Sequence, residues 1–236
     1  LMTWPDPLKE ICSLTLLDKI IQYDKDLLVY LNGLGTENWD GFWLLITNQL
    51  SWIPLYLIFL YLIFRSFGWK KTLGLVLLTA VMITFSDQFT VFMKNYFERL
   101  RPNRDPSINQ LIRILKNNSS FSFVSGHATT SMAVSFFMYL RLHKYYPYTG
   151  LFFIWPLLFA YSRVYIGVHF PLDVIAGALI GLFIGFSFYK QFYISSLAFY
   201  KIIILLIFFL SKNIIINFDE LRRSSRYREK ICSLIY

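Results

Sequence analysis

Apolar residues in this chain gather into long runs that short polar segments separate. The runs cover residues 42–64, 72–95, 126–142, 149–165, 171–189 and 193–210. About 20 predominantly apolar residues cross the hydrocarbon core of a bilayer as a helix. The pattern therefore predicts an all-α protein, an integral membrane helical bundle of about five to six transmembrane helices.

The N-terminal part has a different pattern, because apolar and charged residues alternate over residues 8–33. This spacing favours one or two amphipathic helices that lie in the membrane interface without crossing it. Before this stretch, Pro5, Asp6 and Pro7 do not fit the pattern of a cleavable signal. We therefore expect an N-terminal amphipathic helix beside the bundle.

Composition agrees with a membrane location. Hydrophobic residues make up 56% of the chain, aromatic residues 19% and charged residues 16%, which is outside the range of soluble domains. The net charge of +9 belongs to cations spread over short segments and the C-terminal tail, without a basic stripe. Nucleic acid is therefore not an expected partner. Cys12 and Cys232 form neither a disulfide framework nor a metal-binding spacing.

Alternating crossings predict which ends of the runs share a membrane face. The end of 72–95, the start of 126–142, the end of 149–165 and the start of 171–189 would meet at one face. The opposite face would carry Arg65, Lys70, Lys71, Arg141, His143 and Lys144. Short loops rich in Lys and Arg stay in the cytoplasm, so the first face is predicted to point outward. The basic tail opposes this tendency if the run 193–210 also crosses.

Three polar clusters lie at the predicted outward face, in residues 94–102, 122–129 and 162–173. Ionisable groups at membrane depth are costly and usually functional. Lys94 and Arg101 are seven residues apart and would project from one side of a helix. Each alone is equally explained as a cation that snorkels to the interface.

Asp87 lies on the same predicted stripe, seven residues before Lys94. An acid at this depth is explained by a polar contact between helices. We expect Asp87 to have a supporting role.

Ser125, Gly126 and His127 begin the predicted helix 126–142. Free backbone amides and the positive end of the helix dipole make such a start an anion site. Ser125 alone is also explained as a helix N-cap. The imidazole of His127 requires a partner in this position, which the N-cap explanation does not supply.

In the third cluster, Pro171 as the first helical residue puts Asp173 at the third position, from which it can reach back to His169. A carboxylate that holds one ring nitrogen leaves the other basic and oriented, as a nucleophile or base requires. Asp173 alone is also explained as an acid that complements the helix dipole.

Two histidines and one aspartate also fit a metal-binding triad. Lys94, Arg101 and Arg163 would repel a metal ion, whereas they suit phosphate oxygens. We therefore expect a phosphate site with no metal and no other cofactor.

These residues resemble the motif of the type 2 phosphatidic acid phosphatase (PAP2) superfamily, over roughly residues 50–190. Its first part is present as Lys94, Arg101 and Pro102. Its second part, usually Pro-Ser-Gly-His, reads Val124, Ser125, Gly126 and His127. Its third part is complete as Ser162, Arg163, Gly167, His169 and Asp173. Val124 in place of Pro affects only the rigidity of the entry turn, so activity is expected to survive.

The resemblance implies roles for these residues. His169 would attack phosphorus to form a phosphohistidine, Asp173 would orient it, and His127 would protonate the leaving oxygen and later activate water. The implied phosphate-binding residues are Lys94, Arg101, Ser125, Gly126 and Arg163. Together with the pattern of apolar runs, it divides the chain into three segments: an amphipathic interfacial segment 1–40, a PAP2-like membrane phosphatase domain 41–190, and an additional apolar segment with a basic tail, 191–236.

The expected function is a metal-independent membrane phosphatase that hydrolyses a lipid phosphate or diphosphate. Its partners would be the membrane and an anionic phospholipid or polyprenyl diphosphate, with undecaprenyl diphosphate first. Phosphatidylglycerol phosphate, phosphatidic acid and lipid A phosphates follow as substrates. Lipid phosphotransfer and non-catalytic lipid binding are the alternative functions. We expect it in the bacterial inner membrane, with the site facing the periplasm or outside.

The segment 96–125 is long for a connection and carries several cations. Ile108, Leu111, Ile112 and Leu115 share a helical face, which favours a segment that lies on the membrane above the site. Such a lid suits an anionic lipid head group, and an ordinary solvated loop is the alternative.

Overall fold

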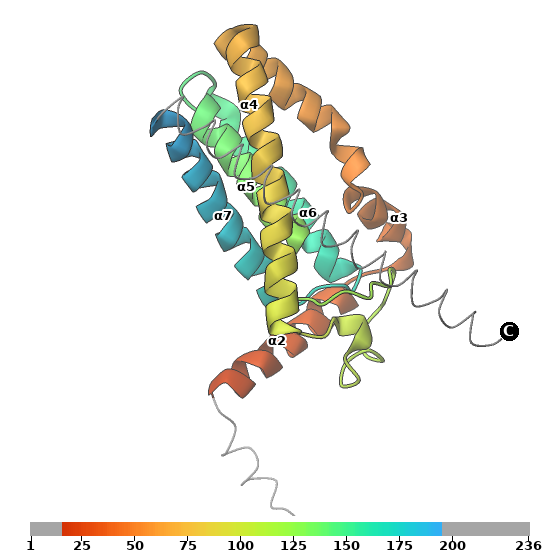
Figure 1. The fold of residues 1–236 in the computed structure, drawn as a ribbon. Helices are drawn as coiled ribbons and strands as arrows, with labels where there is room; N and C mark the ends of the chain where they lie inside the picture. The colour runs from red at the N-terminus through yellow and green to blue at the C-terminus, as the bar shows by residue number, and fades with distance from the viewer. Residues whose placement is uncertain (1–15, 195–236) are drawn as a thin grey trace, which may run out of the picture. The chain divides into compact units, whose positions relative to one another are not determined.

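The computed structural model describes residues 16–194, and every regular element in this range is a helix (Figure 1). The α-helices are α2 (Leu16–Gly33), α3 (Glu37–Ile46), α4 (Ile53–Phe97), α5 (Gly126–Leu142), α6 (Ile154–Tyr165) and α7 (Pro171–Ile194). The 3₁₀ helices are η1 (Gln49–Trp52), η2 (Pro102–Arg104) and η3 (Pro147–Phe153). The all-α prediction is thus confirmed for residues 16–194. Residues 1–15, most of the expected run 193–210 and the basic tail lie outside the described residues.

The chain reverses its direction within α4 at Gly68, and Figure 1 shows the two arms of this helix descending at an angle from one turn at the top. Gly68 has φ 71° and ψ 171°, a conformation that a side chain would oppose. A straight helix of 45 residues would measure about 68 Å, more than twice the hydrocarbon thickness of a bilayer. The break that the sequence predicts between residues 64 and 72 is therefore present, as a turn.

The apolar run 42–64 is not one helix, because it is divided where Asn48, Gln49, Ser51 and Pro54 interrupt its apolar residues. Helix α3 ends at Ile46, η1 follows, and α4 begins at Ile53. The Asn48 side chain accepts a hydrogen bond from the Leu50 amide at 3.1 Å and caps η1. Pro54 lies in the first turn of α4, where its missing amide proton costs nothing. Local side-chain bonding and proline thus divide a run that composition alone would join.

Two described segments are long and apolar enough to cross a membrane, Gln49–Arg104 and Pro171–Gln191. The first contains both arms of α4. Helix α5 has the bounds that the sequence predicts, and η3 together with α6 fills the run 149–165.

Helices α5 and α7 pack closely through a stripe of glycines on α7. A Cβ atom at Gly177 would lie 2.7 Å from the carbonyl oxygen of Ser125, and one at Gly185 would lie 2.6 Å from that of Ala133. Gly181 meets the carbonyl oxygen of Thr129 in the same way. Small residues at four-residue spacing let helix backbones approach each other closely. This contact fixes the start of α7 against the start of α5.

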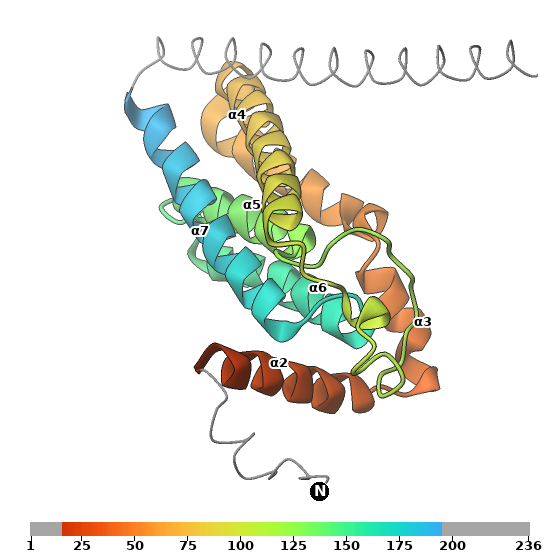
Figure 2. The same ribbon diagram turned by 60° about the horizontal axis from the view of Figure 1, so that its bottom comes forward.

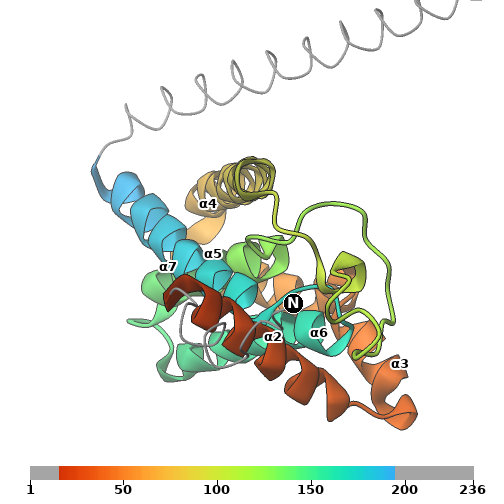
Figure 3. The same ribbon diagram turned by 90° about the horizontal axis from the view of Figure 1, so that it is seen from below.

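Helix α2 lies across the end of the bundle where α6 stops and α7 begins (Figures 2 and 3). The Asn32 amide donates hydrogen bonds to the carbonyl oxygens of Tyr165 at 2.7 Å and Val164 at 3.3 Å. Leu28 packs in a cluster with Ile108, Val164 and Phe170.

The expected amphipathic helix is therefore present in α2, but its inward side includes polar groups. Asp24, Leu28 and Asn32 are buried, whereas Leu16 and Leu17 are exposed. The end of α6 has carbonyl oxygens and the start of α7 has an amide without partners in their own helices, and polar side chains of α2 form hydrogen bonds with them.

The segment 96–125 forms no α-helix after α4 ends, so the helical face predicted for Ile108, Leu111, Ile112 and Leu115 is not formed. After α4 ends, η2 is its one regular element. Ile108 is buried in the α2 cluster, Ile112 packs against the same cluster, and Leu115 packs against Tyr165 and its neighbours. Leu111 alone of the four is largely exposed. The apolar side chains therefore anchor the segment to the protein, because α2 supplies an apolar surface that local sequence does not reveal.

The glycine stripe predicts a packing defect in Gly185→Ala. The added methyl would press on the Ala133 carbonyl and should destabilise the fold by about 1–3 kcal/mol. Thermal unfolding in detergent measures the change. Gly74→Ala is the matched control, because a Cβ there meets nothing within 4 Å and alanine favours a helix. Equal melting temperatures for the two variants would contradict the prediction.

Candidate active site

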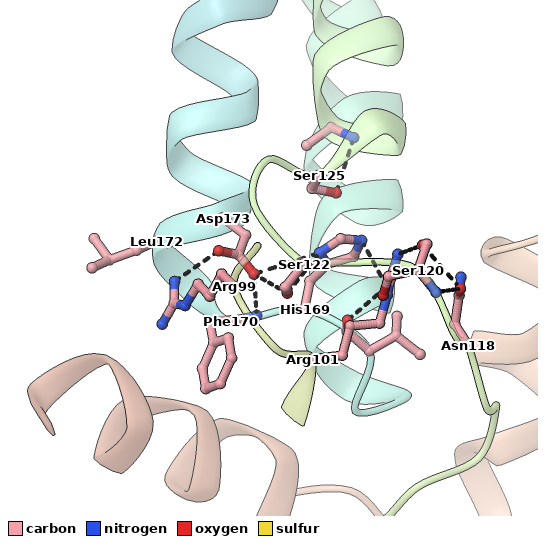
Figure 4. A network of polar contacts seen from close by, with 12 residues as sticks. Arg99, Arg101, Asn118, Ser120, Ser122, Ser125, His169, Phe170, Leu172 and Asp173 are labelled. Carbon is pink, nitrogen blue, oxygen red and sulfur yellow. Dashed lines mark hydrogen bonds and ion pairs between the residues drawn. The ribbon is translucent and has the colours of Figure 1, made fainter. Parts of the chain in front are cut away.

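The three polar clusters converge at the end of the bundle where α4 ends, α5 begins, α6 ends and α7 begins. The Ser125 amide donates a hydrogen bond to the carbonyl oxygen of Asp173 at 3.0 Å, which joins the second and third clusters. Arg101 Nη1 donates to the carbonyl oxygen of Val168 at 2.8 Å, which joins the first and third. Figure 4 shows these segments meeting around His169. All the site residues predicted from the sequence thus lie at one end of the fold.

His169 is buried, and both of its ring nitrogens have polar neighbours (Figure 4). Arg101 Nη1 lies 3.1 Å from Nε2, while Asp173 Oδ2 lies 3.5 Å and Ser122 Oγ 3.4 Å from Nδ1. A guanidinium has no acceptor, so Nε2 must accept and the ring proton must reside on Nδ1. The Nε2 lone pair is therefore directed away from Asp173.

Burial determines the charge of this ring. Desolvation lowers the pKa of His169 to about 3, although the Asp173 hydrogen bond opposes the shift. The Arg101 charge acts in the same direction as burial. The imidazole is therefore neutral near pH 7, and a neutral imidazole is the form that can attack an electrophile.

Asp173 is the third residue of α7, as predicted, and has no exposed surface. Oδ1 accepts from Arg99 Nη1 at 2.7 Å, and Oδ2 accepts from the Phe170 amide at 3.1 Å and from Ser122 Oγ. Hydrogen bonds to the ionised form stabilise a buried carboxylate as an anion. This anion holds the proton-bearing side of His169.

Arg101 is buried but does not project from α4, because that helix ends at Phe97. The prediction that it shares a helical side with Lys94 is wrong. Its Nε donates to the Ser120 carbonyl oxygen at 2.8 Å, and Nη2 donates to Ser120 Oγ at 2.9 Å. With Nη1 bonded to Val168, this guanidinium is fixed in front of His169 Nε2.

Three predicted site residues lie close together at the N-terminus of α5: Lys94, Gly126 and His127. A Cβ at Gly126 would lie 3.9 Å from Lys94 Nζ, so the ammonium group faces the first turn of α5. The His127 ring packs against Phe159 with 4.9 Å between centroids. His127 is close enough to His169 and Lys94 for their charges to interact with it.

Ser125 is the N-cap of α5, and its hydroxyl accepts from the Ala128 amide at 3.5 Å. The N-cap interpretation from the sequence is thus confirmed. The contact is long, so it binds the hydroxyl only weakly.

Arg163 is buried at the end of α6 and is only partly paired. Its Nη1 donates to Thr47 Oγ1 at 2.7 Å, beyond the end of α3. Its Nε is buried and, among the described residues, has no hydrogen-bond partner. A buried charged donor without a partner costs free energy unless a ligand accepts from it. Arg163 therefore retains donor capacity near His127, with which it interacts electrostatically.

Asp87 contacts the neighbouring helix, since its Oδ1 accepts from Thr130 Oγ1 at 3.0 Å. This bond joins α4 to α5, and on α4 it lies seven residues before Lys94. The supporting role expected for Asp87 as a polar contact between helices is confirmed.

Sequence reasoning missed three residues that contact the site: Ser122, Arg99 and Asp24. Ser122 lies in a Ser-rich stretch with no distinguishing spacing, and Arg99 resembled an ordinary loop cation. Asp24 had a detectable signal, because it lies on one helical stripe with Leu28 and Asn32. An acid in line with a buried leucine indicates an inward polar contact.

The described residues contain no group of three or more His, Cys, Asp or Glu side chains that could hold a metal ion. The polar groups here are instead a neutral imidazole, a fixed carboxylate and several cations. This combination can bind an anion and present a nucleophile to it.

Comparisons with known proteins agree with this chemistry. Residues 70–197, more than half of the chain, match the model of the PAP2 superfamily. The lipid A 4'-phosphatase of Bacteroides thetaiotaomicron is 35% identical over 171 residues, which cover 70% of this chain and 75% of the relative. The undecaprenyl-diphosphatase of Sulfolobus acidocaldarius is 30% identical, covering 67% of this chain and 82% of the relative.

A solved structure shares the fold. The transmembrane PAP2 type phosphatidylglycerolphosphate phosphatase from Bacillus subtilis matches with a TM-score of 0.59 at 24% identity. The match covers 76% of this chain and 89% of that chain.

The lowered pKa of His169 predicts a pH-dependent contribution to stability. Below pH 6.5 the unfolded chain takes up a proton at this residue that the folded protein does not, so stability falls as the pH drops. At pH 5 this amounts to about 2 kcal/mol. The melting temperature of His169→Gln should therefore fall less than that of the wild type between pH 7 and pH 5. Equal shifts in both proteins would refute this.

Proposed function

The chain belongs to the PAP2 superfamily and is a membrane lipid phosphatase, and we propose that it acts through a phosphohistidine on His169. The observation that carries this mechanism is the set of polar contacts around the His169 ring, from which its tautomer follows. Asp173 and Ser122 face Nδ1, so the Nε2 lone pair points toward Arg101 and can attack phosphorus once a phosphoryl oxygen takes over the Arg101 hydrogen bond. Arg101 Nη1, at 3.1 Å from Nε2, marks where a phosphoryl oxygen would be held.

In the first step, Nε2 of His169 forms a bond to phosphorus while the bond to the leaving oxygen breaks. His127, protonated on both ring nitrogens once the anionic phosphate is bound beside it, donates one proton to that oxygen, and Asp173 stabilises the positive charge that develops on the His169 ring. Lys94, Arg101, Arg163 and the amide at Gly126 bind the other phosphoryl oxygens, with Ser125 beside them. Fixed donors of this kind stabilise charge as it develops in the transition state.

In the second step, the now neutral His127 takes a proton from water. The hydroxide attacks phosphorus, the bond to Nε2 breaks, and inorganic phosphate leaves with His169 neutral again. The proton count balances, because His127 gives one proton to the leaving group in the first step and takes one from water in the second.

A lipid substrate is supported by an apolar cavity of about 670 Å³ beside the site. Its walls come from both arms of α4 and from α5 and α6, and they include Tyr56, Phe59, Ile83, Val134 and Trp155. Phe159 lines the cavity and also packs against His127. An acyl or prenyl chain in this cavity would place its head group at the histidines.

Among lipid phosphates, we place a lipid A phosphate first. The relative with that activity is more similar to this chain than the undecaprenyl-diphosphatase, and both cover two thirds or more of it. Undecaprenyl diphosphate is the second candidate, since the same cavity accepts a prenyl chain. Phosphatidylglycerol phosphate is the third.

The membrane topology is part of the proposal. We propose five crossings, made by the two arms of α4, by α5, by η3 with α6, and by α7. Arg65, Lys70 and Lys71 flank the Gly68 turn at the end opposite the site. Because short basic loops stay in the cytoplasm, the site would open at the periplasmic face of the inner membrane.

The mechanism predicts that His169→Ala reduces phosphate release from lipid phosphates by about 10³-fold or more. Quenching the wild type at alkaline pH with a ³²P-labelled substrate should trap a phosphorylated protein, and the variant should trap none. A chelator should leave wild-type turnover unchanged. Activity in His169→Ala equal to the wild type would refute the proposed nucleophile, and loss of activity with chelator would favour a metal mechanism.

A substrate panel in detergent tests the assignment of the lipid. We expect kcat/KM for lipid A to exceed that for undecaprenyl diphosphate and phosphatidylglycerol phosphate at least about tenfold, a difference of about 1.4 kcal/mol. Phosphate release with malachite green measures each rate. A preference for the diphosphate would reverse the order of our two candidates.

A further inference from the structure

A buried acid on the interfacial helix α2 is bonded to the start of α7. Asp24 is 3% exposed, and its Oδ1 accepts from the Leu172 amide at 2.9 Å. Leu172 is the second residue of α7, so its amide has no partner within the helix. Asp24 therefore supplies, from a distant segment, the acceptor that this helix start requires.

The other oxygen of Asp24 contacts the guanidinium that holds the catalytic carboxylate. Arg99 Nη2 donates to Asp24 Oδ2 and Arg99 Nη1 donates to Asp173 Oδ1, each at 2.7 Å. The guanidinium also lies over the Phe170 ring, 3.9 Å from its centroid. The Arg99 guanidinium thus bridges two carboxylates, and the Phe170 ring packs against its face. Figure 4 shows the contacts of Arg99 with Asp173 and Phe170.

These contacts close a ring through Asp24, Arg99, Asp173 and Leu172. Resting on the function proposed above, we propose that Asp24 and Arg99 are positioning residues of the phosphatase reaction. They hold the Asp173 carboxylate in the orientation that keeps the His169 proton on Nδ1 and aims Nε2 at phosphorus. Helix α2 is then part of the catalytic apparatus and not only a cover for the bundle.

The charges support this assignment. One cation serves two buried carboxylates, so removing Arg99 would leave two anions close together without compensation. Burial raises the pKa of Asp24, while the Arg99 and Leu172 hydrogen bonds act against the shift. Burying an acid is costly, and a side chain that served only to attach α2 would not need a charge.

The chain also contains a matched contact without this link. Lys25, the next residue of α2, forms an ion pair with Asp105 at 2.8 Å and donates to Ser107 Oγ at 2.8 Å. This pair attaches α2 to the segment 96–125, but through residues outside the ring of Asp24, Arg99 and Asp173. A purely structural role for Asp24 predicts that the two attachments are equivalent.

The experiment compares Asp24→Asn, Arg99→Gln and Arg99→Lys with Lys25→Gln in purified full-length protein. We expect Asp24→Asn and Arg99→Gln to lower kcat for the best lipid phosphate about 10–100-fold, with KM changed less than about threefold. Arg99→Lys keeps the charge but not the fork, so it should recover part of the loss. Lys25→Gln should keep kcat within about twofold, although it also removes a contact that attaches α2.

The proposal is overturned if Asp24→Asn and Arg99→Gln keep wild-type kcat, or if Lys25→Gln loses as much. Should Asp24→Asn not purify as a folded protein, the Arg99→Gln and Arg99→Lys pair decides by the partial rescue alone. Failure of the proposed function looks different, because then the wild type releases no phosphate or His169→Ala stays active. In that outcome the positioning role falls with it.

Discussion

A carboxylate with no exposed surface, Asp173, is the constraint on which the arrangement of this protein depends. A buried anion is tolerated only when donors surround it. Its donors come from separate parts of the chain: Arg99 after α4, Ser122 before α5, and the Phe170 amide before α7. His169 completes the shell. Satisfying this one charge therefore requires the segments of the site to meet, so assembly of the bundle end also assembles the site.

Packing in the bundle supports this polar end. The glycine stripe of α7 brings its backbone against α5, and this contact sets His127 and Gly126 relative to His169. Elsewhere in the bundle, residues of α4, α5 and α6 line the apolar cavity. Close packing on one side and open volume on the other give a rigid catalytic end with room for a lipid chain. A membrane lipid phosphatase requires both properties.

The cations of the site divide into two kinds, and the difference suggests how the phosphate is held. Arg101 has its donors bonded to Ser120 and Val168, so it presents a fixed charge that needs no reorganisation. Arg163 retains a buried donor without a partner among residues 16–194. Lys94 lies in the last turn of α4, and its ammonium group faces the first turn of α5. A preorganised charge and an unsatisfied donor together favour an anion as the missing partner.

The sequence by itself determined the helical class, the ends of α5, the turn near Gly68 and the residues of the candidate site. Hydrophobic runs have a period and a length, and motif spacing is local, so both can be read along the chain. Only the tertiary structure showed that Arg101 leaves the helix, that the segment 96–125 packs on α2, and that Arg99 joins Asp24 to Asp173. These contacts join residues about 75 or more positions apart. They form because buried charges and free amides at helix ends need partners, and which partner arrives is decided by how the helices pack.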